Sequence, residues 1–184
     1  MQTVHLLGLC GSLRKASSND VVLRTVAEEL LPAHAVMEIP SLHDIPLYNE
    51  DLDLTESSTP VSVSLLRQMV ANADGVLIAS PEYNHGMSGV IKNTLDWLSR
   101  PHGNSVLKNK PVLVMTASPA FTGGVRAQQQ LNETLWAVQA KLVRYPQIVV
   151  GAVAGKIKDG RLIDEPARQF LAAGIVSLCD TVRG

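Results

Sequence analysis

A short stretch near the start of the sequence combines glycine, hydroxyl, amide and basic side chains in a spacing suited to binding an anion. It covers residues 11–19 and reads Gly-Ser-Leu-Arg-Lys-Ala-Ser-Ser-Asn. Because an apolar run precedes it and a helical pattern follows, free backbone N–H groups and the helix dipole add to the side-chain donors. The candidate phosphate ligands are Ser12, Arg14, Ser17 and Asn19. The alternative interpretation is an ordinary N-cap cluster beside solvated basic residues.

Two common nucleotide-binding patterns are missing from the sequence. Gly8 and Gly11 do not have the spacing of G-x-G-x-x-G, and G-x-x-x-x-G-K-[ST] does not occur. The 11–19 stretch therefore favours one terminal phosphate over ATP or a typical Rossmann-bound dinucleotide.

Hydrophobic periodicity predicts that strands and helices alternate along the whole chain. The expected strands are 4–10, 35–39, 75–79, 112–117 and 148–153. The expected helices are 19–31, 60–73, 88–100, 125–142 and 165–182, with a small hairpin at 156–162. This alternation predicts an α/β fold, a doubly wound five-stranded parallel sheet with helices on both faces, in a single domain over residues 1–184.

Polar and glycine-rich loops follow the first, third and fourth expected strands. They cover residues 11–19, 80–87 and 118–124. Ligands of doubly wound sheets bind outside the carboxyl ends of the strands, where the strand order reverses. We therefore expect the three loops to meet there as one site, which favours phosphate binding over the N-cap alternative.

The long irregular stretch 40–60 separates the second strand from the second helix. Loops of this length inside compact domains are often functional or face a partner. A solvated excursion is the equal alternative, since four acidic residues lie between Glu50 and Glu56.

Composition narrows the classes of function. The 184 residues carry 16 Lys plus Arg against 17 Asp plus Glu, so neither nucleic acid nor an anionic membrane is expected as a partner. No run reaches the roughly 18 apolar residues of a membrane span, and the first residues lack a signal-peptide pattern. Two distant cysteines and five scattered histidines predict neither a disulfide framework nor a metal site. We expect a cytoplasmic protein.

Taken together, these motifs resemble a known family, the NAD(P)H-dependent FMN reductases of flavodoxin-like fold, which includes bacterial chromate, quinone and azo dye reductases. Residues 11–19 resemble its G-S-x-R-x-x-S-x-N phosphate loop. Pro81-Glu82-Tyr83-Asn84, with Gly89, Lys92-Asn93 and Asp96-Trp97, resembles its P-E-Y-N…G…K-N…D-W signature. Gly123-Gly124-Val125-Arg126 resembles its G-G-x-R motif.

The resemblance implies a bound FMN with residues in assigned places. Ser12, Arg14, Ser17 and Asn19 would bind its phosphate, Pro81, Glu82, Tyr83 and Asn84 would line the isoalloxazine, and Ser118, Gly123 and Gly124 would close the other side. Two residues depart from the family pattern: Ser88 replaces a frequent proline, and Ala120 a frequent glycine. Ser88 can cap the same helix, whereas Ala120 puts the third loop's backbone geometry in doubt.

The implied activity is that of an FMN-dependent oxidoreductase working by a ping-pong mechanism. NADPH or NADH would donate electrons, and quinones, chromate or azo compounds would accept them; the flavin carries the chemistry, so no catalytic side chain is required. The alternatives are a reductase that uses FMN as a diffusing substrate and a flavodoxin-like carrier without nicotinamide activity. Near-neutral charge disfavours the carrier. Arg14, Arg100 and Arg126 are candidates for contacting a 2′-phosphate.

The resemblance also implies a homodimer or homotetramer. The expected helix 88–100 carries more apolar residues than one sheet-facing stripe needs, and we expect the excess to pack against a partner. Tyr83 is either a ring platform or a dimer contact, and His85 is interpreted as a rim residue rather than a catalytic acid.

Overall fold

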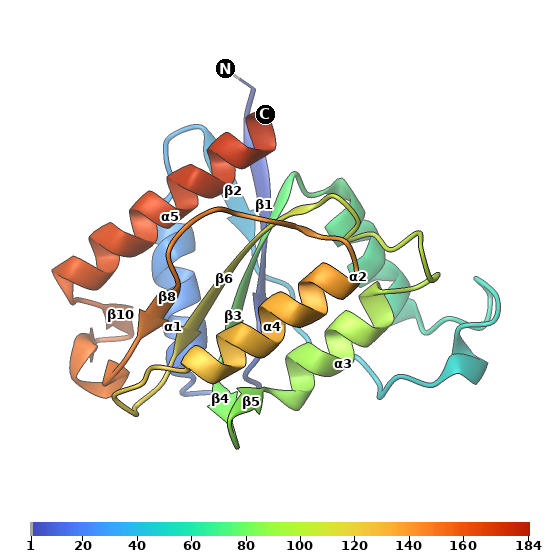
Figure 1. Cartoon of the computed structure of the whole chain (residues 1–184), viewed down its shortest axis with the longest axis horizontal. Coiled ribbons are helices and arrows are strands. Elements are labelled where there is room, and N and C mark those ends of the chain that lie inside the picture. The colour runs from blue at the N-terminus through green and yellow to red at the C-terminus, as the bar shows by residue number, and fades with distance from the viewer. Residues whose placement is uncertain (1) are drawn as a thin grey trace.

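In the computed structural model, which describes residues 2–184, helices cover both faces of a central parallel sheet (Figure 1). The strand order is β2-β1-β3-β6, followed by an edge that β7 and β8 share. The strands are β1 Val4–Cys10, β2 Ala35–Glu38, β3 Gly75–Ser80, β6 Pro111–Ala117, β7 Lys141–Leu142 and β8 Ile148–Val150. The order reverses between β1 and β3, which confirms the predicted doubly wound sheet.

The helices divide the core into two halves. Those on one face are α1 Ser18–Thr25, continued by the π-helical turn η1 Val26–Leu30, and α5 Glu165–Arg183. Those on the other are α2 Val61–Asn72, α3 Gly89–Leu98 and α4 Val125–Ala137. Alternate residues of the buried strands point to opposite faces, so Leu6 joins one half and Leu7 the other.

Side-chain caps explain where three of these helices begin. Ser17 accepts a hydrogen bond from the Asp20 N–H, and Asp164 accepts one from the Ala167 N–H, so each caps its helix as N-cap residues do. Ser88 caps α3 by accepting from the Ile91 N–H at 3.2 Å. The expected capping role of Ser88 is therefore confirmed.

The sheet edge beyond β6 differs from the prediction. A helix over 125–142 and one strand over 148–153 were expected, and both ranges are wrong. Helix α4 ends at Ala137, because Gln139 adopts a positive φ of 60° and Lys141–Leu142 then pairs with β6 as β7. Strand β8 ends at Val150, so two short strands share the fifth position. Tertiary pairing here outweighs a helical pattern that continues in the sequence.

Part of the 40–60 stretch is attached to α3, although most of its side chains are exposed. The Trp97 indole N–H donates to the Pro46 carbonyl at 2.8 Å, and Asn93 donates to the same carbonyl and accepts from the Tyr48 N–H. Inside the stretch only residues Glu50–Leu52 are helical, as the short 3-10 turn η2. The solvated-excursion alternative is therefore wrong for the anchored part.

The predicted hairpin near the C-terminus is confirmed. Strands β9 Ile157–Lys158 and β10 Arg161–Leu162 pair antiparallel around Asp159 and Gly160, both of which have positive φ. Across residues 2–184, no helix combines the length with the apolar character that a membrane crossing needs.

Candidate functional site

The three predicted loops lie together at the edge of the sheet where β1, β3 and β6 end, at the bottom of Figure 1. The first loop begins with a close approach to the start of α3. The Gly11 N–H donates to the Ala79 carbonyl at 2.7 Å, and a Cβ at Gly11 would lie 2.6 Å from Ile91 Cγ1 and 2.7 Å from Ser88 Oγ. Glycine is therefore required here by packing.

Ser17 serves as the N-cap of α1, and a direct bond from its hydroxyl to a phosphate stays a prediction. Its Oγ accepts from the Asp20 N–H at 3.2 Å, and the side chain is buried. A hydroxyl that accepts one bond keeps its own hydrogen, and the first N–H groups of the helix have no partner within the helix. The N-cap alternative is thus correct for Ser17 and compatible with anion binding.

Positive charge at this loop is not neutralised by neighbouring acids. Arg14 and Lys15 are exposed and have no ion-pair partner within residues 2–184. Asp20 lies in the first turn of α1, but its carboxylate already pairs with Arg24 at 2.7 Å. Ser12, half-buried, lines a cavity of about 450 Å³ that opens beside the loop toward residues 37–43.

Asn19 holds the first loop against the end of β6. Its Nδ2 donates to the Ala117 carbonyl at 2.9 Å and its Oδ1 accepts from the Ala117 N–H at 3.1 Å, with the side chain buried. Both ends of the amide are thus engaged by the backbone of one residue. This geometry gives Asn19 a positioning role in the site; direct contact with a phosphate stays a prediction.

The second loop is a tight hairpin formed by β4 Glu82–Tyr83 and β5 Gly86–Met87. Asn84 and His85 form its turn with positive φ values of 51° and 68°, and both are exposed. Pro81 is buried at the hairpin's base, whereas Tyr83 is 55 % exposed. The hairpin therefore presents an aromatic face and polar turn residues to solvent.

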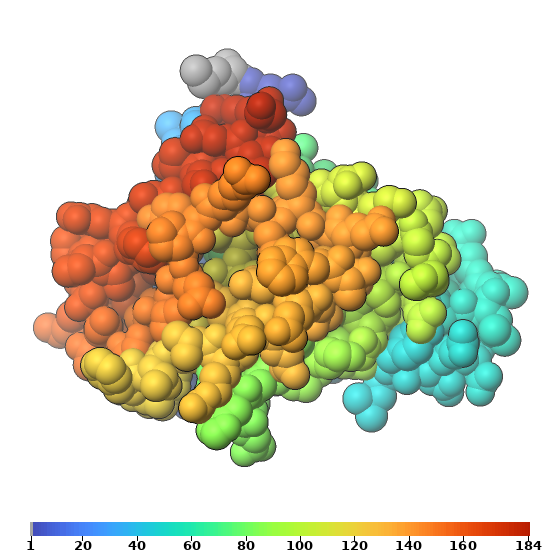
Figure 2. Space-filling view, in the orientation of Figure 1, coloured from blue at the N-terminus to red at the C-terminus, as the bar shows by residue number. Residues whose placement is uncertain are grey.

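Two side chains fix this hairpin to helix α4. Glu82 Oε2 accepts from the Arg126 N–H at 3.0 Å and the Ala127 N–H at 3.2 Å. Gln130 Oε1 accepts from the Met87 N–H at 2.8 Å. The N-cap of α4 is Gly124, which has no side-chain oxygen, so Glu82 supplies the missing cap and a negative charge at the helix start. Figure 2 shows the hairpin protruding beside the start of α4.

The third loop depends on two buried glycines with positive φ. Gly123 has φ 63°, and its added Cβ would clash with Val149 and with the backbone of Gly151; Gly124 has φ 103° and approaches Thr116. A side chain at either position would therefore be strained by the positive φ of the backbone and by the close contact of its Cβ.

The remaining third-loop residues shape its surface. Ser118, buried, accepts through Oγ from the Ala120 N–H at 3.2 Å. Ala120 has no positive φ and accepts from the Gly123 and Ala152 N–H groups, so alanine fits this loop. Phe121 is 94 % exposed and gives the loop an apolar tip.

Other residues of the motifs lie away from the loops. Lys92 and Asp96 form an exposed pair at 2.6 Å, and Asn93 and Trp97 anchor the 40–60 stretch. Arg100 follows the far end of α3 and lines a different cavity.

Sequence reasoning missed Gln130, since nothing in its sequence context distinguishes it from other helical glutamines.

Cys10 ends β1 beneath the first loop. Burial raises the pKa of its thiol above the ordinary value, and the side chain is 8 % exposed. A raised pKa disfavours the reactive thiolate, so Cys10 acts as a small buried hydrophobe. Within residues 2–184, no group of three or more His, Cys, Asp or Glu side chains could hold a metal ion.

The arrangement fits a phosphorylated planar cofactor. A helix start with free N–H groups, hydroxyl donors and an unpaired guanidinium can bind a phosphate. The glycine-shaped backbone of the third loop and the exposed aromatic side chains of the second and third loops can flank a ring. These are the features that FMN requires.

Comparison with known proteins agrees with this geometry. The family model for NADPH-dependent FMN reductase matches residues 4–155. A quinone reductase of Escherichia coli (strain K12) is 34 % identical over 184 residues, covering 99 % of this chain and 97 % of that protein. A 2-hydroxy-1,4-benzoquinone reductase of a Burkholderia species is 34 % identical, covering 88 % and 86 %. Among solved structures, the flavoenzyme NAD(P)H:(acceptor) oxidoreductase FerB of Paracoccus denitrificans matches with a TM-score of 0.84, 31 % identity and 98 % of each chain.

Proposed function

The chain belongs to the NADPH-dependent FMN reductase family, and we propose that it is an FMN-dependent oxidoreductase that passes electrons from NAD(P)H to small quinone-type acceptors. The observation that carries the proposal is Arg14, which has no ion-pair partner within residues 2–184 and lies beside the start of α1 at the same sheet edge as the 82–87 hairpin and the loop with Gly123 and Gly124. The names of the relatives support the choice of quinones among acceptors.

In the proposed site, each loop has its own task. Ser12, Arg14, Ser17 and the N–H groups that open α1 bind the FMN phosphate. The 81–84 segment lines one side of the ring, and Ser118 with Gly123 and Gly124 lines the other. Bound FMN supplies hydride acceptance, so this chain's residues bind, orient and enclose rather than transfer protons.

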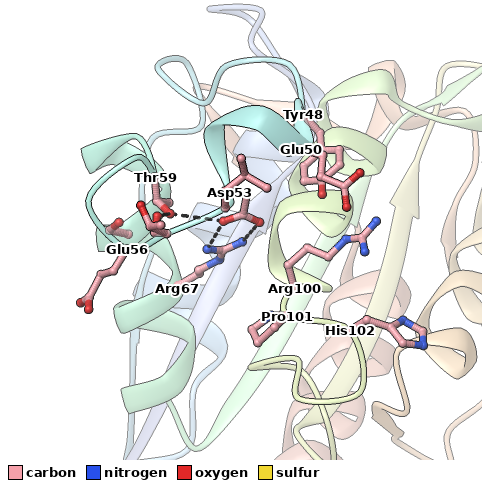
Figure 3. Close-up of a pocket in the computed structure, with 12 residues that line it drawn as sticks. Tyr48, Glu50, Asp53, Glu56, Thr59, Arg67, Arg100, Pro101 and His102 are labelled. Atoms are coloured by element: carbon pink, nitrogen blue, oxygen red, sulfur yellow. Dashed lines mark hydrogen bonds and ion pairs between the residues drawn. The ribbon is translucent and has the colours of Figure 1, made fainter.

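Arg126, exposed in the first turn of α4 at this edge, is the candidate for contacting a 2′-phosphate of NADPH, because Arg14 is assigned to the FMN phosphate. Within one chain Arg100 lies in a cavity to which none of the three loops contributes (Figure 3), and its role toward a 2′-phosphate stays a prediction.

Anaerobic addition of NADPH to the FMN-loaded protein tests the proposal. Rapid bleaching of the flavin absorbance, followed by recovery on adding a quinone, is the expected result. A flavin that stays oxidised would identify an electron carrier instead.

Initial-rate kinetics separate a bound cofactor from a diffusing one. If FMN stays bound, the two substrates use one exposed ring face in turn, and double-reciprocal plots at several quinone concentrations are parallel. Intersecting lines, together with saturation by added free FMN, would favour the flavin-reductase alternative.

We also propose a cytoplasmic homodimer or homotetramer and further acceptors such as chromate or azo compounds. The reasoning from the α3 helix does not support the oligomer, because Ile91, Leu95, Trp97 and Leu98 are all buried within one chain. Exposed Phe121 and Trp136 are the better candidates for a subunit contact. Sedimentation at micromolar concentration tests the assembly.

A further inference from the structure

The hairpin formed by β4 and β5 is too small to hold its own conformation. Its strands pair through two rungs, Glu82 opposite Met87 and Tyr83 opposite Gly86. Two-stranded hairpins are at best marginally stable alone in water, so neighbouring elements must fix this one. The Met87 side chain is buried and anchors the base, whereas the outer rung leads to the exposed turn. The outer rung, at the bottom of Figure 1, therefore needs a second support.

Gln130 of helix α4 supplies that support. Its Oε1 accepts from the Met87 N–H at 2.8 Å. The same amide lies against Gly86, where an added Cβ would be 2.9 Å from Gln130 Oε1 and would have three Gln130 atoms as its nearest neighbours. Gly86 does not have a positive φ, so glycine is required here by this close approach. Strand β5 thus rests directly on the Gln130 amide.

The hairpin is attached to α4 through both of its strands. On β4, Glu82 Oε2 accepts from two N–H groups in the first turn of α4, and on β5 the Met87 N–H donates to Gln130. Glu82 and Met87 face each other in the same rung, and their partners lie one helical turn apart along α4. A single attachment would let the hairpin turn about it, whereas two attachments fix its angle to the helix.

We propose that Gln130 is a positioning residue for the flavin ring: by holding β5 on α4, it sets the angle at which the hairpin presents Tyr83 toward the loop with Gly123 and Gly124. The role rests on the proposed function, because it requires the ring to lie between these two loops. Gln130 acts through the hairpin and not by contact with the flavin. Since hydride transfer depends on alignment more than phosphate binding does, loss of Gln130 should slow flavin reduction more than it weakens FMN binding.

Two neighbouring exposed glutamines of α4 provide a matched pair of variants, Gln130→Ala and Gln129→Ala. Amide exchange of the Met87 N–H, measured by NMR on the full chain without FMN, should become about tenfold faster or more in Gln130→Ala and stay unchanged in Gln129→Ala. The urea midpoint should stay the same in both variants, because alanine is the best helix former and the hairpin base remains buried.

The FMN-loaded variants test the consequence for the ring. Under anaerobic conditions with saturating NADPH, the rate of flavin bleaching should fall about tenfold or more in Gln130→Ala. The dissociation constant of FMN should rise by a smaller factor, because the phosphate contacts of the first loop remain. The visible circular dichroism of bound FMN, which reports the surroundings of the ring, should change. Gln129→Ala should leave all three quantities unchanged.

Gly86→Ala probes the same contact from the side of the hairpin. The added methyl group would displace the Gln130 amide, so this variant should also slow flavin bleaching. In the Gln130→Ala background the same substitution should have little further effect, because the atoms nearest to the methyl group are gone. The two effects should therefore be coupled and not additive.

Three results would overturn the proposal. The first is unchanged exchange of the Met87 amide in Gln130→Ala, which would show that Gln130 does not fix the hairpin. The second is a variant with faster exchange whose flavin bleaching and circular dichroism match the wild type. The third is additive effects of Gly86→Ala and Gln130→Ala. A wild-type flavin that NADPH does not reduce would contradict the proposed function, while amide exchange and circular dichroism would still decide the role of Gln130.

Discussion

The loops after β1 and β2 make opposite use of their polar groups. The short loop at 11–17 leaves Arg14 and Lys15 without ion-pair partners within residues 2–184. The longer stretch at 40–60 uses Asp53 to pair with Arg67 and the Pro46 carbonyl to accept from α3. Length is therefore a poor guide to function here. A loop that satisfies its own polar groups stabilises the fold, and one that leaves donors free can bind a ligand.

The largest effect expected from this comparison is on stability. Asp53→Asn removes a charge from a mostly buried pair and leaves Arg67 without its carboxylate, which should lower the free energy of unfolding by about 2–4 kcal/mol. FMN affinity should not change. Urea unfolding and flavin titration measure the two quantities. Asp51→Asn, an exposed neighbour, is the matched control; equal effects of the two variants would contradict the structural role.

The reverse pattern is expected for the first loop. Arg14→Ala removes a charge-assisted hydrogen bond to a phosphate, worth about 1.5–3 kcal/mol, so the dissociation constant of FMN should rise about ten- to a hundredfold. The free energy of unfolding of the apoprotein should stay unchanged, as should turnover at saturating FMN. Flavin titration of Lys15→Ala provides the control. An Arg14→Ala protein that binds FMN normally would exclude Arg14 from the site.

The hairpin at 82–87 lies between these two cases, since it lines the site but is itself fixed by hydrogen bonds. Glu82→Ala removes the cap of α4 and should cost about 1 kcal/mol of stability. Because the hairpin then loses its fixed position, the dissociation constant of FMN should rise roughly fivefold, which corresponds to about the same free energy as the loss of stability. Glu82→Gln keeps an acceptor and should restore most of both.

Glu133→Ala, an exposed acid on the same helix, controls for lost charge. If Glu82→Ala destabilises the protein but leaves FMN affinity intact, the hairpin does not position the flavin.

The smallest effect is a pH dependence confined to acid conditions. Hydrogen bonds from Arg67 lower the pKa of Asp53. The stabilisation that the Asp53–Arg67 pair contributes is therefore complete above the unfolded-state pKa of Asp53, about 3.9. It is lost as the pH falls through the lower pKa that Asp53 has in the folded protein. The stability difference between the wild type and Asp53→Asn should stay constant near neutral pH and shrink below about pH 4. Urea unfolding across this range measures it, and a difference that shrinks as the pH rises would refute the assignment.

Local patterns in the sequence were sufficient for most of the fold. Apolar runs of strand length and amphipathic helical stretches depend on neighbouring residues, so β1, β3 and α2 were predicted within a residue or two. The three-loop site could be predicted for the same reason, because parallel strands bring their carboxyl ends to one edge. Gly123 and Gly124 were named from sequence, and their positive φ values explain why glycine is required.

The roles of individual side chains depended on contacts that no local pattern encodes. Asn19 and Ala117 are 98 residues apart in the chain, and Glu82 and Arg126 are 44 apart. Likewise, α4 ends where pairing with β6 offers Lys141–Leu142 a better set of hydrogen bonds. The sequence by itself determined which elements form and which loops share an edge, since hydrophobic periodicity and turn chemistry are local. Only the tertiary structure decided which polar groups are used up within the chain and which, like the guanidinium of Arg14, remain available to a ligand, because that depends on long-range packing.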